Sequence, residues 1–104
     1  MFVGVCRISL HLRGVASLKG KRQIVRKIVD RTRAKFNCAV AEVSENDVHR
    51  RAVIGVSVVT NSSSHADSML GNICGFVEGI GVAPVASIET EVIRMGDDTW
   101  EDEW

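Results

Sequence analysis

The chain has 104 residues, the usual size of one domain, and 45% of them are hydrophobic, so it can bury a core and is not expected to be disordered. Its net charge is zero, but residues 1–60 carry 12 Lys/Arg against 4 Asp/Glu, whereas residues 61–104 carry 1 against 9. This asymmetry indicates an electrostatic partner or an attraction between the two halves. No apolar run approaches the roughly 20 residues of a membrane span, so we expect no membrane association.

The three cysteines, Cys6, Cys38 and Cys74, are an odd number without a CxxC pair. They argue against a disulfide framework and a structural zinc site and favour a reducing, cytoplasmic location, with each thiol in the core or a strand. The histidines show no metal-binding spacing, so we predict neither a metal nor a cofactor.

The first half of the chain predicts a strand, a helix and two further strands. Apolar residues alternate over residues 2–12, which is the pattern of a half-buried strand. A helical period begins at Leu18, with Ser17 as a plausible N-cap, and continues to Phe36. Residues 38–44 and the β-branched run 51–60 then indicate two strands joined by a polar turn.

The second half predicts one helix, one strand and a tail. Residues 61–65 supply caps for a helix, where Ser64 and Asp67 resemble a capping box, and glycines at 79 and 81 end it. Residues 85–94 indicate the last strand. We expect a domain over residues 1–95 and an acidic, mobile tail over 96–104, whose tryptophans could fold back on the first helix.

The order β-α-β-β-α-β predicts an α+β, ferredoxin-like fold, with a four-stranded antiparallel sheet and two helices on one face. The other face is rich in valine, so we expect a second copy to cover it and form a homodimer. The apolar contacts of that dimer are predicted at Val3, Val5, Val53 and Val59. Strict alternation also places Arg7, Ser9, His11, Val40, Glu42, Ser57, Val85, Ser87 and Glu89 on this open face.

The first helix is the strongest functional signal, because residues 18–36 hold eight basic residues and one acid. Cations in the first turn of a helix oppose its dipole, at a cost of about 0.3–1 kcal/mol each, so the pattern is unfavourable for structure alone. We therefore predict an RNA- or anion-binding site at Lys19, Lys21, Arg22, Arg26 and Arg33. The alternative is a charged face that meets the acidic half of a second copy.

No catalytic arrangement is recognisable, so we predict a protein that is not an enzyme. The chain lacks a Walker-type phosphate loop, and the open sheet face lacks the aromatic rings with which RNA-recognition motifs stack bases. Arg7, His11, Glu42, Glu89 and Glu91 are predicted to gather at one end of the open face. An ion network is the favoured interpretation of that cluster, and acid–base catalysis is the alternative.

Several stretches of the chain are distinctive. They are GVCRISLHL, SLKGKRQIVRKIVDRTRAKFN, VAEV followed by Asp47, RAVIGVSVVTN and IETEVI. In these stretches the chain resembles the YlxP-like proteins, a bacterial family of unknown function. The resemblance implies a ferredoxin-like fold and no established enzyme activity. It also implies work on the ribosome, because members are commonly encoded beside ribosome-binding factor A and translation initiation factor two.

Three functions are therefore open. The leading hypothesis is a non-catalytic accessory factor that contacts RNA or ribosomal particles through the first helix, in ribosome maturation or translation. The second is a homodimeric regulatory module that binds a small ligand and uses the basic helix for assembly. The third, an acylphosphatase-like enzyme, rests on fold analogy alone.

Overall fold

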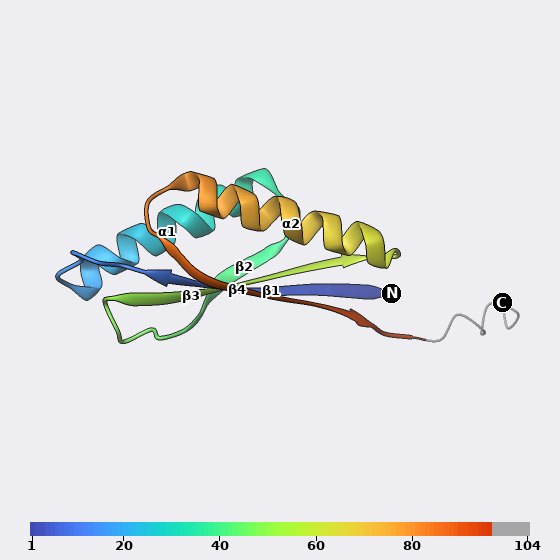
Figure 1. The fold of residues 1–104 in the computed structure, drawn as a ribbon, viewed down its shortest axis with the longest axis horizontal. Helices are drawn as coiled ribbons and strands as arrows, with labels where there is room; N and C mark the ends of the chain where they lie inside the picture. Colours follow the sequence, from blue (N-terminus) through green and yellow to red (C-terminus); the bar gives the residue numbers. More distant parts are fainter. Residues whose placement is uncertain (97–104) are drawn as a thin grey trace, which may run out of the picture.

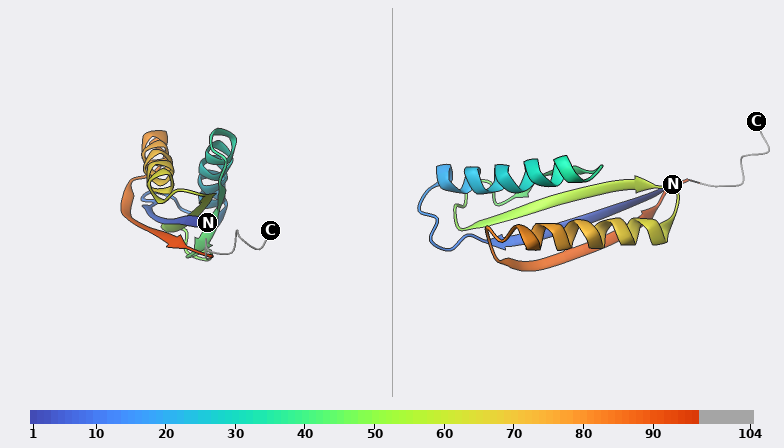
Figure 2. Two further views of the ribbon diagram at one scale, coloured as in Figure 1. Left: turned by 90° about the vertical axis from the view of Figure 1, so that its right-hand side faces the viewer. Right: turned by 90° about the horizontal axis from the view of Figure 1, so that it is seen from above.

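The computed structural model describes residues 1–96 and shows the predicted order of strands and helices (Figure 1). The elements are β1 (Phe2–His11), α1 (Leu18–Lys35), β2 (Ala39–Ser44), β3 (Arg51–Thr60), α2 (Ser63–Ile80) and β4 (Val85–Arg94). The strands form one antiparallel sheet in the order β2-β3-β1-β4, and Figure 2 shows both helices side by side on one face of it. The prediction of an α+β, ferredoxin-like fold is confirmed. The predicted tail lies outside the described residues, except for position 96.

Both helices begin directly after a serine. Ser17 Oγ accepts a hydrogen bond from the backbone of Gly20 at 3.1 Å, and Ser62 Oγ accepts one from His65 at 3.3 Å. Each bond satisfies a backbone N–H that has no partner inside its helix. The cap predicted at Ser17 is confirmed. The capping box predicted at Ser64 is wrong, because Ser62 caps α2, the helix begins at Ser63, and Ser64 lies inside it.

Aliphatic side chains fill the layer between the sheet and the helices. Among the most deeply buried are Ile8, Ile28, Ile54, Leu70 and Ile73, each at most 2% exposed. They come from two strands and both helices, so one core joins all the elements that carry the surface sites described below. This burial is the main favourable term that holds the helices on the sheet.

The cysteines are structural, as predicted. Cys6 on β1 and Cys74 on α2 are buried, with their Sγ atoms 3.1 Å apart, and Cys38 packs partly buried against the same core. Burial raises the pKa of Cys6 to about 12, and the neighbouring Cys74 thiol adds to the shift. Burial also raises the pKa of Cys38. The Cys6 thiol therefore stays protonated at neutral pH and acts as a small apolar residue.

On the two edge strands, β2 and β4, some residues predicted on the open face point to the core instead. Val40 lies opposite Val56 and is buried, so β2 presents Val40 and Glu42 to the helices and not to the open face. The predicted placement of Val40 and Glu42 was wrong because small or apolar residues occur on both faces of β2. The alternation of its sequence therefore does not determine which face of the strand points to the core. Val85 also reaches the core, because the β1–β4 register shifts after Ser9.

Candidate functional site

Four cations form a row along the exposed surface of α1. The basic row consists of Lys19, Arg22, Arg26 and Arg33, all exposed. At 3.6 residues per turn they fall within about 60° of one another, so they follow one flank of the helix. No carboxylate of residues 1–96 lies within 4 Å of these cations, and the structure thus supplies no anionic partner for them.

Contacts at the end of α1 show which flank carries the row. Arg33 Nη2 donates to the Val40 carbonyl on β2 at 3.2 Å, so the row lies on the β2 side of the helix. On the other flank, Lys35 Nζ lies 5.7 Å from the centroid of the Phe76 ring on α2. Lys27, Arg31 and Lys35 form this α2-side flank, which the neighbouring helix partly occupies. The two exposed cationic flanks of α1 thus differ in their neighbours, β2 for the basic row and α2 for the other flank.

Lys21 does not belong to the binding surface, and its predicted role is wrong. Its side chain is 1% exposed, and Nζ lies 2.8 Å from Glu42 Oε2. The ammonium also donates to the carbonyl oxygens of Glu45 and Val48, the latter at 2.6 Å. Lys21 thus ties the first turn of α1 to β2 and to the turn that follows β2, and it is not available to a phosphate.

Local helical spacing contains a signal for this burial. Lys21 lies four residues before Val25, seven before Ile28 and eleven before Thr32, and all four are buried on one arc of α1. The Lys21 ammonium also holds the turn after β2. This turn is unusual because Glu45 has a φ of 61°, and it is closed by a hydrogen bond from the Val48 amide to the Glu45 carbonyl. A lysine within an apolar arc therefore indicates a buried structural ion pair.

The open sheet face carries an apolar row at one end. Val3 lies between Val59 on β3 and Ile93 on β4, which are 65% and 41% exposed. Val5 is the next residue of β1 on this face and is half-buried. Val53 was predicted to join them, but it is only 6% exposed, so it presents little surface to a second copy.

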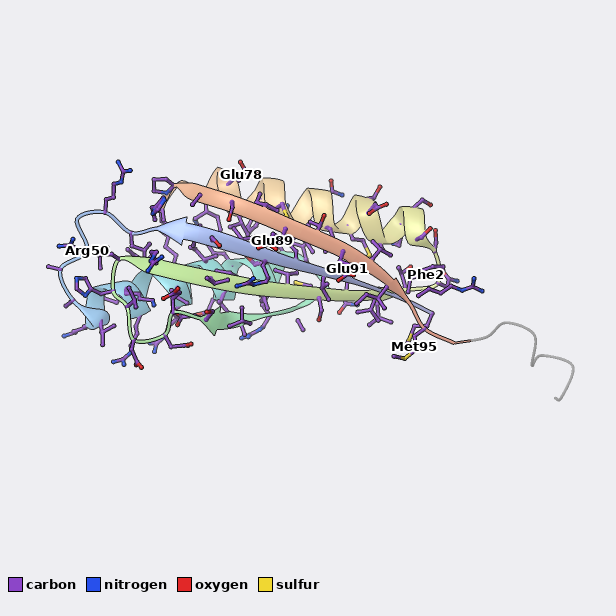
Figure 3. The ribbon with its side chains drawn as sticks, turned by 60° about the horizontal axis from the view of Figure 1, so that its bottom comes forward. Phe2, Arg50, Glu78, Glu89, Glu91 and Met95 are labelled. Atoms are coloured by element: carbon purple, nitrogen blue, oxygen red, sulfur yellow. The ribbon has the colours of Figure 1, made fainter. Side chains whose placement is uncertain are left out.

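The predicted charged cluster is only partly assembled on the open face. Arg7 Nη1 lies 3.5 Å from Glu89 Oε1, and Figure 3 shows Glu89 and Glu91 along β4 on this face. Glu42 is absent from it, because it faces the helices and pairs with Lys21. His11 lies at the end of β1, opposite the first residue of β3. What remains is an exposed ion pair, which contributes about 0–1 kcal/mol to stability.

A basic hollow, which was not predicted from the sequence, lies at the end of the sheet where α1 begins. Its volume is about 590 Å³. This arginine hollow is lined by His11, Arg13, Gly14, Val15, Ala16, Arg50 and Arg51. In Figure 3, Arg50 marks this end of the sheet, opposite Phe2 and Met95. The signal for it is the antiparallel pairing of β1 and β3, which brings the basic end of one strand to the basic start of the other.

Two further features, a metal cluster and a membrane-spanning helix, are absent from residues 1–96. No group of three or more His, Cys, Asp and Glu side chains in residues 1–96 is placed to hold a metal ion. Neither helix in this range combines the length and hydropathy needed to cross a membrane. The surfaces that remain as candidates are the basic row, the open sheet face and the arginine hollow.

Comparisons with known proteins identify a matching family, a relative and a structure of similar fold. Residues 3–90 match the model of a family described as protein of unknown function, DUF503. The chain is 25% identical over 76 residues to the uncharacterized protein YlxP of Bacillus subtilis, covering 73% of this chain and 83% of that protein. It also resembles a de novo designed protein with a ferredoxin fold, with a TM-score of 0.54, 16% identity and coverage of 97% and 92% of the two chains. The designed protein supports the fold alone.

Proposed function

The chain belongs to the DUF503 family of proteins of unknown function, and we propose that it is a non-catalytic, cytoplasmic accessory factor that binds RNA through the basic row of α1. In this proposal the RNA is part of a ribosomal particle, and the factor acts in ribosome maturation or translation. The observation that carries the proposal is the exposure of four cations on one flank of a helix, with no carboxylate of residues 1–96 within 4 Å of them.

The arrangement is unfavourable for the isolated protein. Arg22 and Arg26 are four residues apart, so their like charges face each other on the helix surface and cost about 0.2–0.5 kcal/mol. Lys19 lies in the first turn, where the helix dipole disfavours a cation. A row of phosphates would relieve both terms, because each cation would gain an anion and release the counterions that the nucleic acid had condensed.

The composition of the basic row limits which features of an RNA it can recognise. Guanidinium and ammonium groups bind phosphate oxygens, whereas base recognition in single-stranded RNA relies on stacking rings and hydrogen bonds to base edges. The basic row contains no aromatic residue. We therefore expect binding that depends weakly on RNA sequence and steeply on salt, with a slope of roughly −3 in log K against log salt for four phosphate contacts on a single strand.

Two double variants of α1 test the proposal. Arg22→Glu with Arg26→Glu reverses the centre of the basic row, whereas Lys27→Glu with Arg31→Glu makes the same change of charge, also at a spacing of four residues, on the α2-side flank. The first is expected to weaken binding of a short single-stranded RNA at least about tenfold and to flatten the salt slope, since two phosphate contacts are lost. The second is expected to have a much smaller effect.

Sedimentation with ribosomal subunits across a salt series provides the physiological readout. Co-sedimentation of the natural chain that weakens with salt and is lost in the first variant supports the proposal. Equal loss in both variants would show attraction to total charge instead of to this flank. Absence of binding to RNA and to ribosomal subunits at low salt would reject the proposed function.

The open sheet face favours a second candidate, a homodimeric regulatory module that binds a small ligand. Val59 is 65% exposed within the apolar row, and the adjacent Arg7 and Glu89 give the face both signs of charge. A copy related by a twofold axis would cover the valines and bring cations opposite carboxylates. A shallow hollow of about 540 Å³, lined by residues of β2 and β3 and by Val5, Cys6 and Arg7 of β1, would lie at the boundary of that dimer and could take the ligand.

Sedimentation velocity tests the dimer. The natural chain is expected to sediment as a dimer, and Val59→Glu as a monomer, because it buries a charge in the apolar row. Val48→Glu is the matched control, since Val48 is also exposed but lies in the turn between β2 and β3. A monomeric natural chain at about 100 μM, or a dimer unaffected by Val59→Glu, would contradict this arrangement.

A further inference from the structure

We propose that the arginine hollow is a binding site for a single phosphate group, carried either by the end of an RNA strand or by a small phosphorylated metabolite. The site uses residues of the β1–α1 loop and of the start of β3, so it is separate from the basic row and does not depend on the RNA contact of α1. Its volume of about 590 Å³ lies within the range of small-molecule sites and would hold a phosphate together with its sugar.

The charge of the hollow selects an anion. Arg13, Arg50 and Arg51 line it together with His11, and no lining residue is acidic. No carboxylate of residues 1–96 lies within 4 Å of these guanidinium groups. Guanidinium forks match the geometry of phosphate oxygens and form short, charge-assisted hydrogen bonds with them. Three arginines from two separate segments line this hollow, which distinguishes it from a row of cations on one helix.

The backbone that carries these arginines is held in place. The Leu12 amide donates to the Arg50 carbonyl at 2.8 Å, and the Val15 amide donates to the Leu12 carbonyl at 3.3 Å. These bonds join the β1–α1 loop to the start of β3. Below them, Lys21 fixes the turn that precedes β3 through two carbonyl groups. The hollow is therefore largely formed before any ligand arrives, which reduces the cost of ordering it on binding.

One glycine leaves open space at the wall of the hollow. Gly14 has a φ of 81°, and no other atom lies within 4 Å of the position that a Cβ would take. A residue without a side chain at such a turn lets a ligand approach the backbone closely. α1 begins four residues later, at Leu18, so the positive end of its dipole follows the loop that lines the hollow.

Nuclear magnetic resonance of the full-length, 15N-labelled chain tests the site. The probes are inorganic phosphate, adenosine 5′-monophosphate and a short RNA with either a 5′-phosphate or a 5′-hydroxyl, each at constant ionic strength. We expect the amide signals of residues 13–16 and 50–51 to shift with each phosphate probe. Arg13→Gln with Arg51→Gln should weaken these shifts at least about tenfold, because two charge-assisted contacts are lost. Arg22→Gln with Arg26→Gln is the control and should leave the binding of inorganic phosphate unchanged.

The RNA probes distinguish the two sources of phosphate. Tighter binding of the 5′-phosphate RNA than of the 5′-hydroxyl RNA or the mononucleotide assigns the site to an RNA end, and equal binding of the mononucleotide assigns it to a metabolite. Shifts that map outside the hollow, or that survive Arg13→Gln with Arg51→Gln, would overturn the proposal. If the basic-row variants keep their RNA affinity while phosphate still shifts residues 13–16, the proposed function fails and the phosphate site stands.

Discussion

The two helices share a length, a kind of cap and a face of the sheet, yet their exposed surfaces have little in common. Each has 18 residues, begins after a serine and buries one arc against the same sheet, α1 over β2 and β3 and α2 over β1, β3 and β4. Between its bounds α1 carries eight basic residues and one acid, whereas α2 carries two acids, no Lys or Arg, and three exposed glycines. The fold requires only the buried arcs. The difference between the exposed residues of the two helices therefore has a cause other than packing.

The buried arcs also differ in kind. The arc of α2 is apolar throughout, from Ala66 to Val77, while the arc of α1 begins with Lys21 and ends with Thr32. Thr32 satisfies its hydroxyl by donating to the Ile28 carbonyl one turn earlier at 2.7 Å. Lys21 has to find its partners outside the helix. The position of α1 therefore depends on a polar contact, and that of α2 on apolar burial.

Removing the buried charge of α1 is expected to have the largest effect on stability. Glu42 Oε2 is buried and has no hydrogen-bond partner among the described groups, so the Lys21 ammonium compensates its charge. Lys21→Ala would leave that carboxylate uncompensated and remove the ammonium from the Glu45 and Val48 carbonyl groups, of which Glu45 keeps its bond from the Val48 amide. The change is expected to lower the free energy of unfolding by about 3–5 kcal/mol. Urea unfolding measures the change.

Lys19→Ala is the matched control for this loss. Lys19 lies two residues earlier on the same helix but is exposed, so its removal is expected to change stability by less than about 0.5 kcal/mol. Equal midpoints for Lys21→Ala and Lys19→Ala would show that Lys21 is not a structural residue and would return it to the predicted binding set.

Local patterns were sufficient to predict the fold, and apart from the capping box at Ser64 the failures at the candidate sites concern contacts between segments distant in sequence. Alternation and helical spacing placed two strands, residues 51–60 and 85–94, at their observed bounds. They could not reveal that Lys21 is neutralised from β2 and from the turn after it, because those partners lie 21 to 27 residues away. The arginine hollow was missed for the same reason, since it exists only once β1 and β3 are paired.

The glycines of α2 offer the next largest effect, and in the opposite direction. No atom outside the local helix lies within 4 Å of a Cβ built at Gly71 or Gly75. Replacing either by alanine is therefore expected to stabilise the protein by about 0.5–1 kcal/mol, because glycine loses more backbone entropy in a helix. For a domain of this size that gain corresponds to a rise in Tm of roughly 2–8 °C by calorimetry.

The glycine of α1 is the internal comparison. A Cβ at Gly20 would lie 3.3 Å from Val15 Cγ1, so Gly20→Ala should gain less than either α2 variant or lose stability. A loss of stability in Gly75→Ala would mean that another surface approaches the glycines of α2 closely in solution. The contrast between the helices would then reflect two interfaces instead of one.

The smallest effect, a change in the first turn of α1, separates binding from stability most directly. Neither helix has an acidic residue in its first turn. Lys19→Glu reverses a charge that opposes the dipole of α1, and Ser63→Glu places the same side chain in the first turn of α2. Each is expected to stabilise the protein by about 0.3–1 kcal/mol at low ionic strength and by less in 1 M salt, where exposed charges are screened.

Lys19→Glu alone should also weaken RNA binding, because it removes a cation of the basic row. If both variants gain stability and both keep the RNA affinity of the natural chain, the cations of α1 oppose its dipole without serving RNA; if Lys19→Glu loses affinity while gaining stability, α1 retains an unfavourable charge because that charge contacts phosphate.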